Sequence, residues 1–174
     1  MKRLIDIIIS SITLIGFAPI GIIIIIILSI TGEGEIFYRQ SRIGKNGKII
    51  RLFKFTTMLK NSPNLGAGDI TLKNDPRVLP LGKLLRKTKL NEFPQFINVF
   101  IGEMSIVGPR PLVINQYKMI PEILLNKIKP LKPGITGIGS IIFRDEEFFL
   151  DQVKEKAQLY YEKEIVPYKA TLEC

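Results

Sequence analysis

A long apolar run near the start of the chain limits what this protein can fold into. It extends from Leu4 to Ile30, and Asp6 is the only charged residue within it. About 20 apolar residues suffice for a helix to cross a bilayer, whereas a helix this uniformly apolar is unusual in the core of a soluble domain. Because proline removes a helical N–H and clashes with the preceding turn, Pro19 predicts a kink near the middle of the run. The run is predicted to be embedded in a membrane.

The charges on either side of this run predict its topology. Lys2 and Arg3 precede it, and residues 37–68 contain many lysines and arginines and no acidic residue. Because positive charge favours the cytosolic side, both ends of the run prefer the same side of the membrane. Residues 1–32 are therefore predicted to form a re-entrant hairpin, whose broken backbone must be shielded from lipid. Two alternatives stay open: a single kinked spanning anchor, and a cleaved signal peptide, for which residues 31–34 make a poor cleavage site.

The composition restricts the chemistry of the remaining chain. Histidine is absent and Cys174 is the only cysteine, which excludes a Ser-His-Asp triad, a Cys-His pair, a His-ligated metal and an intrachain disulfide. Catalysis must therefore rest on carboxylates, lysine, arginine, tyrosine, serine or threonine. Residues 33–174 amount to about one domain. The formal net charge of +9 favours anionic partners such as lipid headgroups, nucleotides, phosphorylated lipids or nucleic acid.

Asn46-Gly47 predicts a β-hairpin between residues 37 and 58, because this dipeptide is a strong signal for a tight hairpin turn. Basic residues recur at every third position on either side of it. Folding the chain about this dipeptide pairs Arg39 with Lys54, Arg42 with Arg51, and Lys45 with Lys48. Like charges directly opposite each other are destabilising, so this pairing favours a basic ribbon against an anionic surface. A solvated loop with an accidental period is the alternative.

Four further segments have simpler patterns. Residues 61–76 are rich in Gly, Asn, Asp and Pro and predict a loop. Residues 79–87 predict an amphipathic helix that lies on the membrane surface. Residues 138–143 predict a short strand, and the tail from Asp151 predicts a helix of mixed charge.

The segment Asn91-Glu92-Phe93-Pro94 has the pattern of a helix start. Asn91 is suited to cap the helix, Pro94 is suited to its first turn, and Gly102 is expected to end it. Asn91 and Glu92 are then expected at the positive end of a helix. Phosphates and metal-bound anions are favoured at such an end.

Two downstream segments offer charged groups for a site. The turn Gly108-Pro109-Arg110-Pro111 fixes an arginine, and the planar guanidinium of arginine matches phosphate. The alternative is an ordinary turn with a solvated arginine. Arg144 is followed by Asp145 and two glutamates, which are oxygen ligands suited to Mg²⁺. A solvated acidic cluster is the commoner explanation of such a run.

Taken in order, these motifs resemble the bacterial sugar transferase family, the monotopic polyprenol-phosphate phosphoglycosyl transferases. The matching segments are the Lys2-Arg-Leu-Ile-Asp6 start with Pro19, Phe37-Tyr-Arg-Gln-Ser-Arg-Ile-Gly44, Lys54-Phe-Thr-Thr-Met58, Asp75-Pro-Arg-Val78, Leu81-Gly-Lys-Leu-Leu-Arg86, Leu90-Asn-Glu-Phe-Pro-Gln95, Asn98-Val99, Gly102-Glu-Met-Ser105, Val107-Gly-Pro-Arg-Pro-Leu112 and Lys132-Pro-Gly-Ile-Thr-Gly137. Together they extend from residue 1 to about residue 145, and a C-terminal piece found in many relatives is expected to be missing.

The resemblance implies an α/β, mostly helical fold. The expected protein is monotopic, with a re-entrant membrane helix (residues 1–32), interfacial amphipathic helices, a small β-hairpin, and a catalytic domain (residues 33–174) on the cytosolic face of the bacterial inner membrane. The implied reaction transfers a sugar 1-phosphate from a nucleoside diphosphate sugar, such as a UDP-sugar, to undecaprenyl phosphate. UMP is released and glycan assembly begins. Anionic membrane lipids are further expected partners, nucleic acid is not expected, and a homodimer is left open.

The resemblance also assigns roles to individual residues. Members of the family use Mg²⁺ and form a phosphosugar intermediate on an aspartate, whose position Asn91 occupies here. A neutral amide is a poor nucleophile. Glu92 and Asp145 are the implied metal ligands. The matching basic residues, implied to bind the diphosphate or the lipid phosphate, are Lys54, Arg86, Arg110 and Arg144. Thr56 and Gln158 stand where relatives more often carry a basic and an acidic residue.

Four explanations of Asn91 stay open. The chain is an inactivated or engineered form; Glu92 has taken over attack or metal binding; another carboxylate such as Asp145 serves; or the protein binds without turnover. A non-catalytic membrane protein that binds lipid phosphate or nucleotide sugar is therefore the alternative to an enzyme.

Overall fold

The computed structural model describes residues 1–31, 33–62, 75–143 and 157–173. Helices dominate this part of the chain, and its strands form two small two-stranded sheets. The expected α/β, mostly helical architecture with a long N-terminal apolar helix is confirmed.

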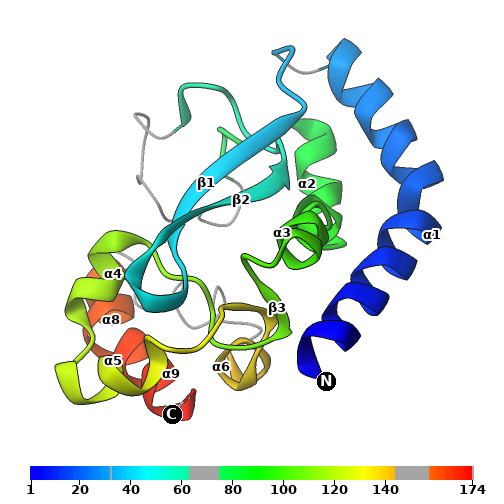
Figure 1. Ribbon diagram of the computed structural model, residues 1–174. Coiled ribbons are helices and arrows are strands. Elements are labelled where there is room, and N and C mark those ends of the chain that lie inside the picture. The colour runs from blue at the N-terminus through cyan, green and yellow to red at the C-terminus, as the bar shows by residue number, and fades with distance from the viewer. Residues whose placement is uncertain (32, 63–74, 144–156, 174) are drawn as a thin grey trace.

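The apolar run forms a single helix, α1 (Lys2–Thr31), which continues through Pro19. Within the described residues it is the one helix that is long and apolar enough to cross a membrane. Figure 1 shows α1 (blue) curving along one side of the domain, past α3 and α2. Large side chains on its outer face stay exposed, for example Ile12 and Ile15 at 67% and 75%. The proline therefore does not divide the run into two separate helices.

The predicted hairpin is present as β1 (Phe37–Ile43) and β2 (Ile49–Phe55), which pair antiparallel. Its predicted register is wrong by one residue. The observed partners are Phe53 for Arg39, Ile50 for Arg42 and Ile49 for Ile43. The turn explains the difference, because Asn46 and Gly47 both take positive φ (59° and 77°) within a longer connection that places Asn46 at its centre.

This register removes the predicted opposition of like charges. Arg39 instead lies over the ring of Phe53, with its guanidinium carbon 4.8 Å from the ring centroid. The other face of β2 is buried at Ile50 and Leu52 and continues to Lys54, because side chains alternate along a strand. Lys54 therefore extends the buried row of the hairpin.

Two helices pack between the hairpin and α1 (Figure 1). They are α2 (Pro80–Lys87), where a helix was predicted, and α3 (Gln95–Ile101). The 3-10 turn Leu90–Glu92 separates them, so Asn91 lies in this turn and the prediction that it caps a helix is wrong. Pro94 directly precedes α3, after the turn that Phe93 N–H closes on Leu90 O. Gly102 ends α3 at φ 94°, as predicted.

A second, parallel sheet joins β3 (Ser105–Val107) to β4 (Gly134–Thr136). Between them lie α4 (Ile114–Met119) and α5 (Glu122–Ile128), which the sequence patterns did not predict. The strand predicted at residues 138–143 is wrong: α6 (Ile138–Ile142) follows β4 directly. Apolar residues in so short a run suit either structure.

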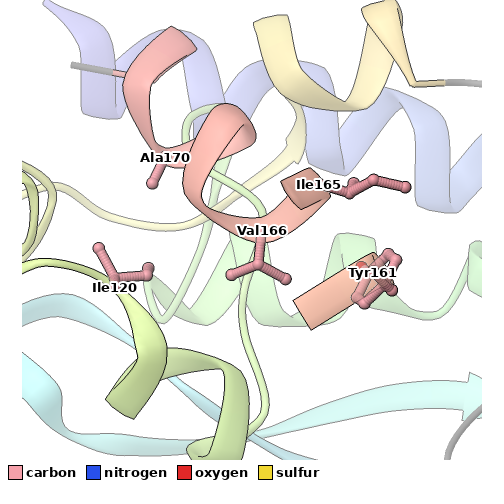
Figure 2. Packing of buried hydrophobic residues seen from close by; sticks show 5 residues of the cluster. All are labelled: Ile120, Tyr161, Ile165, Val166 and Ala170. Atoms are coloured by element: carbon pink, nitrogen blue, oxygen red, sulfur yellow. The ribbon is translucent and has the colours of Figure 1, made fainter. Parts of the chain in front are cut away.

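The predicted C-terminal helix is confirmed for its described residues. It consists of α8 (Ala157–Tyr160), a π-helical turn (Tyr161–Ile165) and α9 (Val166–Leu172). Figure 2 shows the cluster that holds it, in which Val166 and its neighbours lie near Ile120 at the end of α4. Most of the loop predicted at residues 61–76, together with the start of the tail from Asp151, lies outside the described residues.

Two other apolar clusters fix the elements that carry the site. One joins α1 to α2 and β2 through Ile24, Leu28, Phe55 and Leu85. The other joins β2 to α3 and the segment after it through Ile50, Leu52, Val99 and Met104. Burying each such side chain contributes about 1.5–3 kcal/mol. β2 is therefore held by packing against α1 and α2 in one cluster and against α3 in the other.

Candidate functional site

An ion pair lies where β2 meets the 3-10 turn before α3. The Lys54 ammonium is 3.4 Å from Oε1 of Glu92, and the two side chains are 19% and 32% exposed. Lys54 reaches this place because it follows the buried row of β2, and Glu92 because it ends the turn Leu90–Glu92. The site is thus formed by residues far apart in sequence.

Surrounding charges set the ionisation of both groups. Burial alone raises the pKa of Glu92, but the positive charges of Lys54, Arg110 and Lys89 outweigh it and lower that pKa. Burial lowers the pKa of Lys54, and nearby Arg42 and Arg110 lower it further against the opposing charge of Glu92. Both groups therefore lie in one electrostatic neighbourhood with Arg110.

This neighbourhood, which we call the cation cluster, consists of Lys54, Arg110 and Lys89, which act on Glu92, and of Arg42, which acts on Lys54. Three cations act on the Glu92 carboxylate, so positive charge predominates among these residues, which suits a diphosphate. Arg42 and Lys89 were not predicted as site residues. Arg42 belonged to the predicted basic ribbon, but only the observed register places it on the same face of the hairpin as Lys54. Lys89 is notable for a left-handed backbone (φ 60°), which is uncommon outside glycine.

Acid is expected to weaken this arrangement. Since the folded-state pKa of Glu92 lies below its ordinary 4.5, its contribution to stability is complete above that pH and is lost as pH falls through the folded value. Glu92→Gln is expected to flatten the pH dependence of unfolding below about pH 4.5, measured by circular dichroism in detergent. Glu122→Gln, at an exposed position of α5, is the matched control and should keep the wild-type profile. A pH profile of Glu92→Gln identical to that of the wild type would contradict a lowered pKa of Glu92 in the folded protein.

Close backbone contacts fix the turn that carries Arg110. The Gly108 N–H donates to Thr136 O at 2.9 Å, and the Gly134 N–H donates to Pro109 O at 2.9 Å. A Cβ on Gly134 would lie 2.1 Å from the Gly108 nitrogen, so only glycine permits this approach. The second sheet therefore holds the Arg110 turn against β4.

Two buried oxygens at the site lack partners. Oδ1 of Asn91 and Oγ1 of Thr56 form no hydrogen bond with the described residues, and both residues are 8% exposed. An unpaired buried polar atom normally costs about 1–3 kcal/mol, and such atoms call for a specific explanation, of which a bound group is one. Thr56 follows Lys54 by two positions and Asn91 precedes Glu92. Both oxygens therefore belong to segments that carry the ion pair.

The described residues offer few ligands for a Mg²⁺ ion. Within them, no group of three or more acidic, His or Cys side chains could hold a metal ion. Mg²⁺ is often bound by one or two carboxylates together with substrate phosphates. Glu92 supplies one carboxylate, and Oδ1 of Asn91 supplies an adjacent unpartnered oxygen. These two residues fit Mg²⁺ only when substrate phosphates complete its coordination.

The remaining predicted site residues are not part of the cation cluster as described. Arg86 lies on α2, where its Nη1 is 3.7 Å from the sulfur of Met58. It is not among the charges that shift the pKa of Lys54 or Glu92. Arg144 and Asp145 lie outside the described residues.

Comparison with known proteins agrees with this arrangement of motifs. A family model described as bacterial sugar transferase matches residues 1–168. The chain belongs to the bacterial sugar transferase family. The predicted family membership is therefore confirmed over nearly the whole chain.

Relatives within this family carry informative names. A UDP-glucose:undecaprenyl-phosphate glucose-1-phosphate transferase of Klebsiella pneumoniae is 40% identical over 90% of this chain, and its namesake in Escherichia coli K12 is 37% identical over 91%. The chain spans about a third (34%) of the length of these two relatives. The exopolysaccharide production protein ExoY of Rhizobium meliloti is 31% identical over 87% of this chain, which covers 73% of ExoY.

Proposed function

We propose that this family member transfers a sugar 1-phosphate from a UDP-sugar to undecaprenyl phosphate at the cytosolic face of the bacterial inner membrane. The product is undecaprenyl diphosphosugar, and UMP leaves. The observation that carries the proposal is the cation cluster, in which Lys54 pairs with Glu92 at 3.4 Å and the charges of Arg110 and Lys89 act on the same carboxylate. The names of relatives, which specify UDP-sugars and undecaprenyl phosphate, support the same reaction.

The residues of the cluster suit the charge changes of this reaction. The bond between the sugar-bearing phosphorus and the bridging oxygen breaks, and a bond to an oxygen of the lipid phosphate forms. Lys54 and Arg110 stabilise the negative charge that develops on the departing UMP, and such positioning and charge stabilisation dominate phosphoryl transfer. Mg²⁺, when held by Glu92 and Asn91, would supply further charge neutralisation. Because Asn91 is neutral, Glu92 is the residue of this pair that supplies a carboxylate.

The contacts of α1 support a monotopic attachment through one continuous helix. Its 30 residues extend about 45 Å, enough to cross a hydrocarbon core of about 30 Å. Yet Asp6, near its start, bonds to β3, and Leu28, near its end, packs in the cluster with Phe55 and Leu85. A helix that crossed the bilayer would carry one of these ends away from the domain. We therefore place both ends of α1 on the cytosolic face.

Release of UMP tests the proposed reaction directly. Membranes containing the full chain are incubated with a UDP-sugar, Mg²⁺ and undecaprenyl phosphate, and UMP is measured over a panel of UDP-sugars. We expect UMP release that depends on the lipid phosphate. Absence of release with every donor would contradict the enzymatic proposal.

The unpartnered Oδ1 of Asn91 favours a second candidate function, a membrane-bound relative that binds nucleotide sugar or lipid phosphate without turnover. Asn91→Asp distinguishes the two. If UMP release arises only in Asn91→Asp, the natural chain is the binding form. If the natural chain already releases UMP and the substitution changes the rate little, another group performs the chemistry.

A further inference from the structure

The first turns of α1 contain a buried carboxylate that the proposed reaction does not use. Asp6 is 4% exposed although it lies in the apolar run. Its carboxylate accepts hydrogen bonds from Oγ of Ser105 (2.9 Å) and from the backbone N–H of Ile106 (3.0 Å). Burying a charge is costly unless it is paired or hydrogen-bonded. These hydrogen bonds therefore hold the start of α1 against β3.

Arg3, one turn earlier, binds a second element of the domain. Its Nη1 and Nη2 donate to the carbonyl oxygens of Val99 (2.5 Å) and Phe100 (2.6 Å). These carbonyls belong to the last turn of α3, where cations are favoured. A Cβ on Gly102 would lie 3.1 Å from Nη2 of Arg3, so the guanidinium lies close against the glycine that ends α3.

The two elements bound by Arg3 and Asp6 lead directly to the site. β3 ends at Val107, and the turn that carries Arg110 begins at the next residue. α3 is joined at its other end to Glu92 through Phe93 and Pro94. α1 also touches this other end, because the ring of Phe17 stacks on that of Phe93 with centroids 3.5 Å apart. One helix thus contacts both segments that carry the site: β3, which leads to the Arg110 turn, and α3, which follows Glu92.

We propose that Arg3 and Asp6 are positioning residues that hold Glu92 and Arg110 at the spacing required by a diphosphate. This inference rests on the proposed function, because the diphosphate is the ligand of that same site. Arg3 holds α3 and Asp6 holds β3. Because these two residues lie one turn apart on α1, they set the distance between the two segments that carry Glu92 and Arg110. The outer face of α1, with residues such as Ile12 and Ile15, remains free for lipid. Membrane attachment and site geometry are therefore separable functions of α1.

Substitutions of the full chain in phosphatidylethanolamine–phosphatidylglycerol vesicles test this role. Asp6→Ala and Arg3→Ala are compared with Thr13→Ala, a partly exposed α1 residue whose hydroxyl bonds only to Ile9 O in the described structure. We expect all three to float with the vesicles as the wild type does. UMP release should fall about 100-fold in the first two, as for a displacement of about 1 Å, and their affinity for UDP should weaken. Thr13→Ala should retain both.

A purely structural role for Asp6 would lower stability without changing the affinity of the folded protein for UDP. Equal UDP affinity in wild type and Asp6→Ala would therefore overturn the proposal. If Asp6→Ala fails to fold, Asp6→Asn and Ser105→Ala are tested in its place. Asp6→Asn keeps an acceptor for the Ile106 N–H. Both should fold and show intermediate losses of UDP affinity, and wild-type affinity in both would overturn the proposal.

Failure of the proposed function gives a different result. In that case wild type itself would not bind UDP. The positioning role is then judged by amide hydrogen exchange of residues 105–110 in wild type and Asp6→Asn. Faster exchange in the variant would support it, and identical exchange would overturn it.

Discussion

Replacing Glu92 with glutamine is expected to lower UMP release by at least about 100-fold, the typical cost of removing one preorganised electrostatic group from an active site. The variant keeps the shape of the side chain but removes the charge that pairs with Lys54 at 3.4 Å. Under the proposed function, it also removes the carboxylate that would bind Mg²⁺ beside the diphosphate. Steady-state UMP release from a UDP-sugar, with the lipid phosphate in excess, measures the effect.

Glu122→Gln is the matched control for this prediction, because it makes the same change at an exposed position of α5. It should retain wild-type UMP release. Circular dichroism of Glu92→Gln near neutral pH should still report a folded, helical protein. Activity of Glu92→Gln within about threefold of wild type would remove Glu92 from the chemistry, since a catalytic group contributes far more.

The hairpin illustrates how much of the fold the sequence could predict. Asn46-Gly47 correctly indicated a turn and two antiparallel strands. The register could not be read from the turn alone, because a longer connection with Asn46 at its centre shifts the pairing by one residue. That shift decides which side chains share a face. It places Arg42 in the same row as Lys54, near Glu92, and takes Arg39 to the opposite face.

The site was predictable where a motif fixes a local turn. Arg110 lies in its Pro-rich turn and reaches the same neighbourhood as Lys54 and Glu92. Lys89 and the parallel pairing of β3 with β4 were not predictable, because they depend on contacts between distant segments. The contact of Asp6 was not predictable either, although the residue stands out in sequence as the lone charge in an apolar run. Its partner, Ser105, lies 99 residues away.

Asn98 is a buried polar residue whose purpose became clear only in the structure. In sequence it interrupts the apolar positions of α3, and it is fully buried. Its Oδ1 accepts a hydrogen bond from Phe53 N–H (3.0 Å), and its Nδ2 donates to Arg51 O (2.9 Å) and to Oε2 of Glu103 (2.7 Å). The side-chain amide thus acts as a neighbouring strand would, and it holds β2 immediately before Lys54.

Asn98→Leu is expected to destabilise the protein by about 2–5 kcal/mol, because it removes the partners of a backbone N–H and a backbone carbonyl at the centre of the domain. Unfolding in detergent followed by circular dichroism measures the loss. Asn115→Leu makes the same change at an exposed position of α4 and should alter stability by less than about 0.5 kcal/mol.

In Asn98→Leu, β2 is free to shift relative to α3, so the folded fraction should also bind UDP more weakly as Lys54 moves from Glu92. Wild-type stability in Asn98→Leu would mean that the apolar cluster of Ile50, Leu52 and Val99 alone positions the hairpin.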